Sequence, residues 1–258
     1  MWRSSPQQLK EKQMPIKVSL TIPVELYTYN ELSDKAKEYP RNYFIENWID
    51  DWWSKEIISE CKEDAKQYGF TIDNVQYTGF HAQGDGACWT GSVEILKFLE
   101  KFGNDSIGFE GWRVLYNEIN AGVRITIQRL VNANYYNIDS MCVDVSDFDI
   151  LDYISKGTIK SDSILKGMSV EDVTKLIIAD ADCPYKSAED VHKWILDEAK
   201  KFAETIYRRL KEGYEYMCSD EYIGECYDCN DIYFNKEGGQ VDSAIVAIYL
   251  HEIKQLTK

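Results

Sequence analysis

The alternation of apolar and polar residues predicts an α+β protein in which helices flank an antiparallel sheet. Residues 16–22 alternate with period two, which is typical of a half-buried strand. From Asn30 onward, apolar residues recur at helical spacing as far as Gly69, a residue type that commonly ends helices. This stretch predicts two helices, or one helix bent at Pro40, because proline lacks the N–H that a helix interior needs.

Two β-hairpins are expected in the middle of the chain. Residues 70–94 return to period two around Asp85-Gly86, and an Asp-Gly pair is a strong signal for a tight turn. Residues 123–131 and 135–145 are two further alternating segments, joined by a short turn. These signals predict an antiparallel sheet of two or more hairpins, packed on one face by several helices.

Helical spacing returns at 93–102 and again in the C-terminal third of the chain. Residues 150–168 show no periodicity and are the best candidate for an internal domain boundary. The polar residues 1–15 indicate a flexible arm, so a single α+β domain is expected over 16–258. Helices are expected from Ser169, from Ser187 to about Gly213, from Ser219, and over Ser243–Leu256, with a small hairpin around 236–239.

The composition is that of a packed globular protein with a strong negative charge. There are 29 Lys and Arg residues against 44 Asp and Glu residues, a formal charge of -15. This charge repels phosphate backbones and anionic membranes, so we expect neither direct nucleic-acid binding nor membrane binding. It leaves open a partner with a basic surface, or mimicry of DNA. Seven cysteines without an apolar leader predict a reducing, cytoplasmic compartment.

Each predicted hairpin separates an apolar face from a polar one. The polar faces carry His81, Gln83, Cys88, Thr90 and Ser92 in the first hairpin, and Arg124, Thr126, Gln128, Ser140, Cys142 and Asp144 in the second. These groups are short and mostly uncharged, whereas a solvated face usually carries Lys and Glu. Placed in one sheet, they would form a concave floor for a small polar ligand. The alternative is an ordinary polar face covered by a loop or helix. The predicted ligand-binding residues are His81, Gln83, Asp85, Thr90, Arg124, Gln128 and Asp144.

The pairing of these residues depends on the length of the first turn. A two-residue turn at Asp85-Gly86 places Gln83 opposite Cys88 and His81 opposite Thr90. A four-residue loop places His81 opposite Cys88, which would pair a base with a nucleophile. Because no third orienting group is evident, we assign no catalytic residues and favour a non-enzymatic role.

A cysteine cluster near the C-terminus is the strongest metal-binding candidate. Cys226 and Cys229, with Cys218 upstream, have half the spacing of a zinc site. No second pair or nearby histidine completes a tetrahedron, and the sequence has no phosphate-binding glycine loop. Neither a metal nor a cofactor is therefore expected.

Three segments resemble a widespread family of bacteriophage-encoded proteins of unknown function. They are YTYNELSDKAK at 27–37, QGDGA at 83–87, and YEYMCSDE at 214–221 running on to NDIYF at 230–234. That family often has small hydroxyl residues in place of His81 or Cys88, and it usually continues its first helix where this chain has Pro40. The resemblance implies a virus or prophage origin and an accessory role in the cytoplasm of an infected cell.

The sequence and this resemblance together predict a phage accessory protein that inhibits a host defence or regulatory function. It would bind a host protein or sequester a small polar, nucleotide-like signal on the sheet. The alternatives are a hydrolase of a small signalling molecule, or an acidic DNA-mimic or antitoxin-like interaction protein. The chain could form a homo-oligomer in any of these roles.

Overall fold

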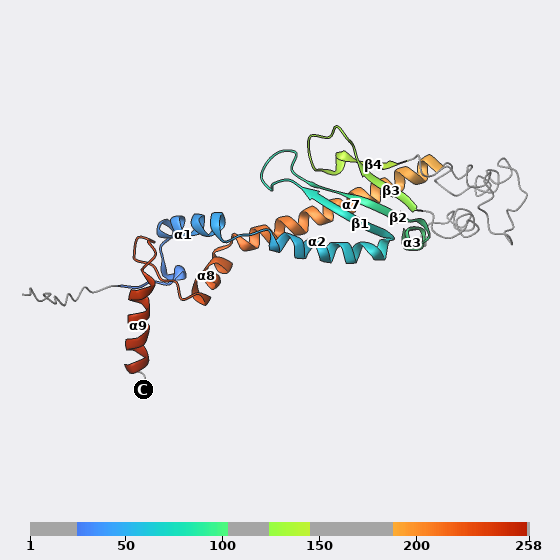
Figure 1. The fold of residues 1–258 in the computed structure, drawn as a ribbon. Coiled ribbons are helices and arrows are strands. Elements are labelled where there is room, and N and C mark those ends of the chain that lie inside the picture. Colours follow the sequence, from blue (N-terminus) through green and yellow to red (C-terminus); the bar gives the residue numbers. More distant parts are fainter. Residues whose placement is uncertain (1–24, 103–123, 145–187, 257–258) are drawn as a thin grey trace, which may run out of the picture. The chain divides into compact units, whose positions relative to one another are not determined.

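The structure is a computed structural model that describes residues 25–102, 124–144 and 188–256. These residues form helices and a four-stranded antiparallel sheet, which confirms the predicted α+β class (Figure 1). The chain divides into two compact units. Unit 1 joins Met1–Phe44 to Asp220–Lys258, and unit 2 is Ile45–Ser219.

The sequence predicts one domain from residue 16 onward with a possible internal boundary at 150–168. Among the described residues, 25–44 and 220–256 belong to unit 1, and those between them belong to unit 2. Several predictions lie outside the described residues. They concern the arm at 1–15, the strand at 16–22, the boundary at 150–168 and the helix from Ser169.

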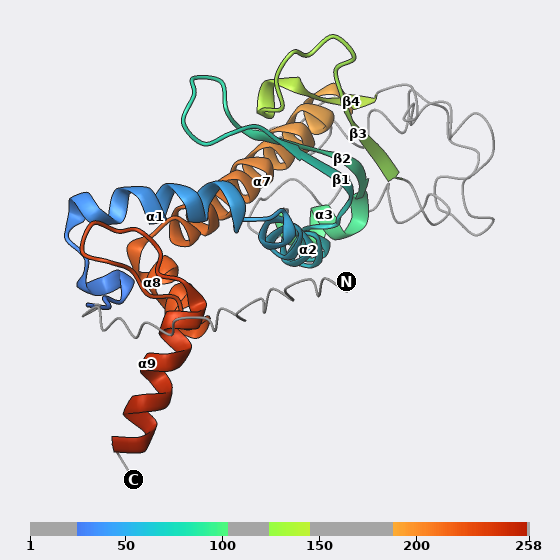
Figure 2. The same ribbon diagram turned by 60° about the vertical axis from the view of Figure 1, so that its left-hand side comes forward.

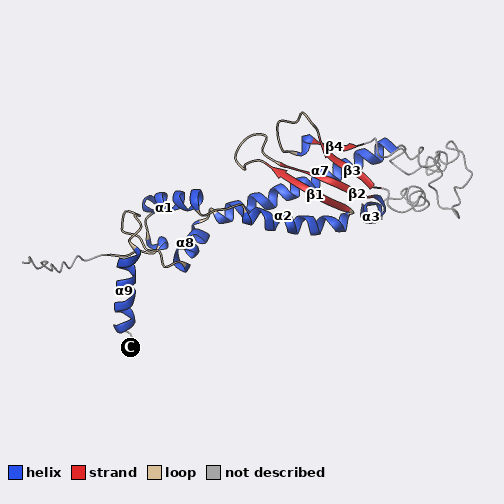
Figure 3. Cartoon of the chain, in the orientation of Figure 1, coloured by secondary structure: helices blue, strands red, loops and turns tan. Residues whose placement is uncertain are grey.

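The sheet of unit 2 contains both predicted hairpins. Its strands are β1 (Phe70–Tyr77), β2 (Ala87–Glu94), β3 (Arg124–Arg129) and β4 (Met141–Asp144), in the order β1-β2-β3-β4 (Figure 3). All neighbouring strands are antiparallel. The prediction that the two hairpins share one sheet is confirmed.

The connections within the hairpins are longer than predicted. Residues 78–86 join β1 to β2, and residues 130–140, with the 3-10 helix η3 (Ile138–Ser140), join β3 to β4. A type I′ turn needs positive φ at both central residues. Within residues 78–86, only Gly84 has a positive φ, of 97°. Asp85-Gly86 is therefore not the tight turn that the sequence suggests.

The helices of unit 2 lie against one face of the sheet (Figures 1 and 2). They are α2 (Trp52–Ala65), the 3-10 helix η2 (Lys66–Tyr68), α3 (Ile95–Phe102) and α7 (Ala188–Met217). The predicted end at Gly69 is confirmed, because this residue caps η2 with a φ of 78°. The predicted helix from Ser187 is also confirmed, although α7 continues past Gly213.

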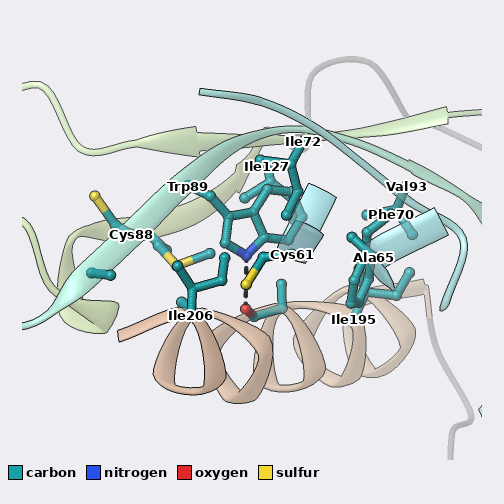
Figure 4. Close-up of a cluster of buried hydrophobic side chains, with 14 of the residues drawn as sticks. Cys61, Ala65, Phe70, Ile72, Cys88, Trp89, Val93, Ile127, Ile195 and Ile206 are labelled. Carbon is teal, nitrogen blue, oxygen red and sulfur yellow. Dashed lines mark hydrogen bonds between the residues drawn. The ribbon is translucent and has the colours of Figure 1, made fainter. Parts of the chain in front are cut away.

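Trp89 on β2 lies at the centre of this packing (Figure 4). Its indole Nε1 donates a hydrogen bond to the carbonyl oxygen of Ala199 on α7, at 3.0 Å. Ala199 and Ala203 are fully buried, and their small side chains let the helix backbone approach the sheet. Around Trp89 the core also contains Cys61, Ala65, Phe70, Ile72, Val93, Phe98, Ile125, Ile127, Met141, Ile195, Ile206 and Leu210.

Unit 1 is built from short helices and a small hairpin. It contains the 3-10 helix η1 (Tyr29–Glu31), most of α1 (Asp34–Asn47), α8 (Asp220–Cys229) and α9 (Ser243–Leu256). Isolated bridges pair Phe234 with both Tyr27 and Gln240. The predicted final helix has the bounds of α9.

Of the two predicted arrangements, two helices or one helix bent at Pro40, the structure has two helices, and Pro40 lies inside the first of them, α1. The helix runs through Pro40 and ends at Asn47, so the break before α2 lies at residues 48–51. A proline removes the N–H that would bond to the carbonyl four residues earlier. Here that carbonyl belongs to Ala36 and is closely approached by Gly238, where an added Cβ would clash with it. The carbonyl of Pro40 itself accepts a hydrogen bond from Tyr227 Oη at 2.8 Å.

Asp220, the first residue of α8, connects three elements of unit 1. Its Oδ1 accepts hydrogen bonds from Tyr29 Oη at 2.7 Å and from Arg41 Nη2 at 2.7 Å, and Lys37 Nζ lies 3.7 Å from Oδ2. Partial burial alone would raise the Asp220 pKa, but the hydrogen bonds from Tyr29 and Arg41 outweigh it. They hold the pKa below the ordinary value of 3.8.

We predict that Trp89→Phe lowers the free energy of unfolding by about 1–3 kcal/mol, because it removes a buried hydrogen bond and leaves a small cavity. Urea denaturation followed by circular dichroism measures this change. The matched control is Trp52→Phe, at a side chain that is 64% exposed, which should change stability by less than about 0.5 kcal/mol. Equal effects of the two substitutions would contradict the central role of Trp89.

We predict that Asp220→Asn destabilises unit 1 at neutral pH, and that its difference from the wild type shrinks as the pH falls. Because the pKa of the folded state is depressed, the stabilisation is present above pH 3.8 and is lost as the pH falls through the folded-state pKa. Amide hydrogen exchange in α1 and α8 measures the effect. Asp228→Asn, at an exposed aspartate of the same helix, is the control and should show no such pH dependence.

Candidate functional site

The face of the sheet opposite Trp89 carries short, uncharged polar side chains. Side chains alternate along a strand, so this face is formed by the residues between the core positions. We call it the polar face. Its uncharged residues are Thr71, Asn74 and Gln76 on β1, Thr90 and Ser92 on β2, Thr126 and Gln128 on β3, and Cys142 on β4. The same register assigns the charged positions Glu94, Arg124 and Asp144 to the end of this face away from the 78–86 loop, and the buried Cys88 to the end beside it.

The strand register aligns these groups in rows across the sheet. Ser92 pairs with Thr71 on one side and with Thr126 on the other, and Thr126 pairs in turn with Asp144. Residues that pair in this way have Cβ atoms about 4.5–5.5 Å apart. A continuous row of hydroxyl-bearing residues therefore crosses three strands.

A second row lies one step closer to the loop at 78–86. Thr90 pairs with Asn74, and Gln128 pairs with Cys142. Thr90 and Gln128 each lie one residue beyond the Gly91–Ile127 pair, so they are neighbours across β2 and β3. The mostly uncharged face predicted for the two hairpins is thus present on the strands of the sheet, although His81 and Gln83, which the alternation pattern also places on it, lie outside the strands.

The seven predicted ligand-binding residues are not gathered in one place. Thr90, Arg124, Gln128 and Asp144 lie on strands, as predicted. His81, Gln83 and Asp85 lie in the 78–86 loop, because β1 ends at Tyr77 and β2 begins at Ala87. The predicted partners of Cys88 and Thr90 are therefore wrong: Cys88 pairs with Gln76, and Thr90 pairs with Asn74.

Distance along the strands separates the two ends of this set. Arg124 pairs with Glu94, the last residue of β2, whereas the 78–86 loop precedes its first residue. Seven steps of about 3.3 Å place these ends roughly 23 Å apart. A small ligand cannot contact Arg124 and the loop residues together.

Asp85 organises the loop. Its Oδ2 accepts hydrogen bonds from the backbone N–H groups of Ala82, at 2.6 Å, and His81, at 2.8 Å. The Ala82 hydrogen bond is the largest cause of a lowered Asp85 pKa. The carboxylate that the sequence suggests for a ligand therefore stabilises the loop itself.

Phe80 anchors the loop to the helices, a role that the alternation pattern does not predict. Its ring stacks on Tyr214 with centroids 5.2 Å apart and contacts Tyr207 at 5.6 Å, both on α7. Tyr207 Oη also donates a hydrogen bond to the carbonyl of Gly79 at 3.1 Å. His81 lies edge-on to Tyr214 at 6.3 Å. An aromatic residue at the start of a loop, followed by exposed positions, is the signal that could have revealed this anchor.

Exposed apolar side chains lie in the connection between β3 and β4. Val131 is 96% exposed, Tyr135 59% and Leu130 48%. This connection meets the first loop, since the Cβ of Asn137 lies 2.8 Å from the position of a Cβ added at Gly86. We call residues 78–86 and 130–140 together the rim loops. They place an apolar patch at the end of the polar face.

Cys88 does not have the surroundings of a nucleophile. It is buried, and burial raises the pKa of its thiol, although a hydrogen bond with Ser140 and the charge of Arg129 oppose this shift. His81 lies in the exposed loop and is not its strand partner. The described ranges contain no cluster of three or more His, Cys, Asp or Glu side chains that could hold a metal ion.

Comparison with known proteins identifies a family for most of the chain. Residues 52–220 match a domain of unknown function, DUF8835. The chain belongs to this family. The match coincides closely with unit 2, so the sheet, the polar face and the rim loops all lie within the DUF8835 domain. A search of curated proteins and a search of solved structures each found no match.

The length and apolar character of the described helices determine whether any of them could cross a membrane. None of those in residues 25–102, 124–144 and 188–256 combines the length and the apolar character that a bilayer span requires.

We predict that Asp85→Ala accelerates hydrogen exchange at the His81 and Ala82 amides, because both lose their carboxylate acceptor. The amides of β2 should keep their protection, since the strand pairing does not depend on the loop. Asp197→Ala, at an exposed aspartate of α7, is the matched control. Unchanged exchange in Asp85→Ala would show that another interaction orders the loop.

Proposed function

We propose that this chain is a non-enzymatic binding protein whose DUF8835 domain contacts another protein through the polar face and the rim loops. The observation that carries this proposal is the sheet face itself: uncharged hydrogen-bonding residues cross neighbouring strands and end beside exposed Val131 and Tyr135. Interfaces commonly combine such polar groups with apolar and aromatic anchors.

The chemistry of the polar face differs from that of the exposed side of α2. The exposed side of α2 carries Lys55, Glu56, Glu60 and Glu63, which are long or charged side chains that remain in water. Thr, Ser and Asn cost less free energy to bury than an ionised group does. Charged residues are accordingly depleted at the centres of interfaces. The polar face therefore suits a surface that becomes covered in a complex.

The partner should carry positive charge around the contact. The chain has a formal charge of -15, which attracts a basic surface over a distance and increases the rate of encounter. The resemblance to bacteriophage proteins supports a host protein of defence or regulation as this partner.

The other proposals receive less support from the geometry. Sequestration of a small polar signal requires the predicted residues to converge, but Arg124 and the His81 loop lie at opposite ends of β2. A hydrolase requires an activated nucleophile, and Cys88 is buried with a raised thiol pKa. Sequestration and hydrolysis are therefore alternatives to protein binding, and sequestration is tested by native mass spectrometry of the same chains.

We predict that Thr90→Arg abolishes recovery of the partner, because a long cation in the centre of the polar face prevents close contact. Tagged wild-type and variant chains are used to purify bound proteins from a bacterial lysate, and the recovered proteins are quantified by mass spectrometry. Asn74→Arg, at an exposed neighbour on β1, is a second variant that disturbs the fold less.

Ser59→Arg is the matched control, because it adds the same charge to the exposed side of α2. It should recover the same partner as the wild type, and circular dichroism should show that all four chains are folded. Recovery of identical proteins by all four chains would refute the proposal. A small molecule found on the wild type by native mass spectrometry, and lost in Thr90→Arg, would replace it with sequestration.

A further inference from the structure

Unit 1 contains a pocket outside the DUF8835 match. Its volume is about 380 Å³. Two of its residues, Tyr39 and Tyr43, lie one turn apart on α1, with their rings stacked at a centroid distance of 6.4 Å and an angle of 25°. Tyr39 is 66% exposed and Tyr43 43%. The lining is Tyr39, Pro40, Tyr43, Tyr227, Phe234, Gly239 and Gln240.

The floor of the pocket is rigid. Tyr227 and Phe234 are buried, and their rings meet edge to face at 5.0 Å. Burial raises the pKa of Tyr227 to about 12, so its hydroxyl stays protonated and donates to the carbonyl of Pro40 at 2.8 Å. Phe234 is held by backbone hydrogen bonds to Tyr27 in both directions, each 2.9 Å. A ligand would therefore meet a preformed aromatic surface, which reduces the entropy lost on binding.

The surroundings of the pocket are acidic. Three exposed carboxylates, Glu38, Asp228 and Glu237, adjoin lining residues or their turn in the sequence, against one exposed cation in the same turn, Lys236. The cations of α1 nearest to them, Lys37 and Arg41, are engaged by Asp220. A ligand with positive charge is favoured by these carboxylates, and a guanidinium also packs well on exposed tyrosine rings.

We propose that this pocket binds a proline-rich segment of a partner protein, in polyproline II conformation, with arginine beside its prolines. The exposed Tyr39 and Tyr43 rings and the buried Tyr227 and Phe234 rings together form an aromatic surface on which proline rings can pack, and the stiff polyproline II helix loses little entropy on binding. Its backbone carbonyls have no internal hydrogen bonds, so they can accept from the exposed Gln240 amide and from phenol groups at the rim.

The proposal is independent of the function assigned to the polar face, because it concerns a different unit and different residues. Two other peptide-binding modes suit this site less. Strand addition needs an unpaired backbone edge, whereas Phe234 and Gln240 are already paired in the small hairpin. An amphipathic helix needs a groove long enough for residues two turns apart, which exceeds a pocket of about 380 Å³.

The test is fluorescence anisotropy of a labelled peptide, made of three Pro-Pro-Ala repeats flanked by arginines, titrated with the full-length protein. We expect saturable binding. Tyr39→Ala should weaken it at least tenfold, a loss of about 1.4 kcal/mol or more, because the substitution removes an exposed ring of the pocket lining. Tyr216→Ala, at a tyrosine of unit 2 that is 51% exposed, is the matched control and should bind as the wild type does. Circular dichroism confirms that both variants are folded.

Three further peptides make the result decisive. Replacing every proline with alanine, with the arginines kept, should remove most of the binding, and equal binding would overturn the proposal. Tighter binding of a proline-free peptide that carries trimethyl-lysine would also overturn it, in favour of a cage for a quaternary ammonium ion. Binding of the chain's own residues 1–24 as a peptide, without binding of the proline repeats, would assign the pocket to the N-terminal segment instead.

Discussion

The contact between Trp89 and α7 is the constraint on which the architecture of unit 2 depends. The indole fills the space between sheet and helix, and its N–H donates to the carbonyl of Ala199 on α7. The small side chains of Ala199 and Ala203 allow the helix to lie close enough for this hydrogen bond. Because Trp89 occupies one side of β2, alternation places Thr90 on the other. Pairing of β2 with β1 and β3 then extends this division over the sheet. The polar face is therefore a direct consequence of how the core is packed.

Period-two alternation predicted the strands well, because it depends only on which side of the sheet each residue faces. Ile125 and Ile127 are fully buried and Gln128 is exposed, as the pattern requires. The loops could not be predicted in this way. Asp85-Gly86 has the composition of a tight turn, but the Asp85 carboxylate bonds to Ala82 and His81 within a wider loop. A dipeptide signal does not reveal such a competing side-chain acceptor.

Pro40 illustrates a second limit. The cost of a proline within a helix depends on what happens to the carbonyl four residues before it, and here Gly238 approaches that carbonyl from more than 200 positions away in the sequence. The pocket of unit 1 has the same origin. Tyr39 and Tyr227 belong to opposite ends of the chain, and only folding brings them together. Local patterns can place a residue on a helix face, but they cannot identify its distant neighbour.

The negative charge of the chain is not concentrated on its two candidate binding surfaces. A formal charge of -15 would suggest electrostatic binding, yet most residues of the polar face are uncharged, and the pocket of unit 1 is lined by aromatic and other uncharged residues. Long-range charge mainly changes how often a partner is encountered, whereas desolvated contacts determine how long it stays. In an acidic protein with uncharged binding surfaces, different residues therefore control the rate of encounter and the lifetime of the complex. Attraction is provided by carboxylates that remain hydrated, and close contact by groups whose burial costs little.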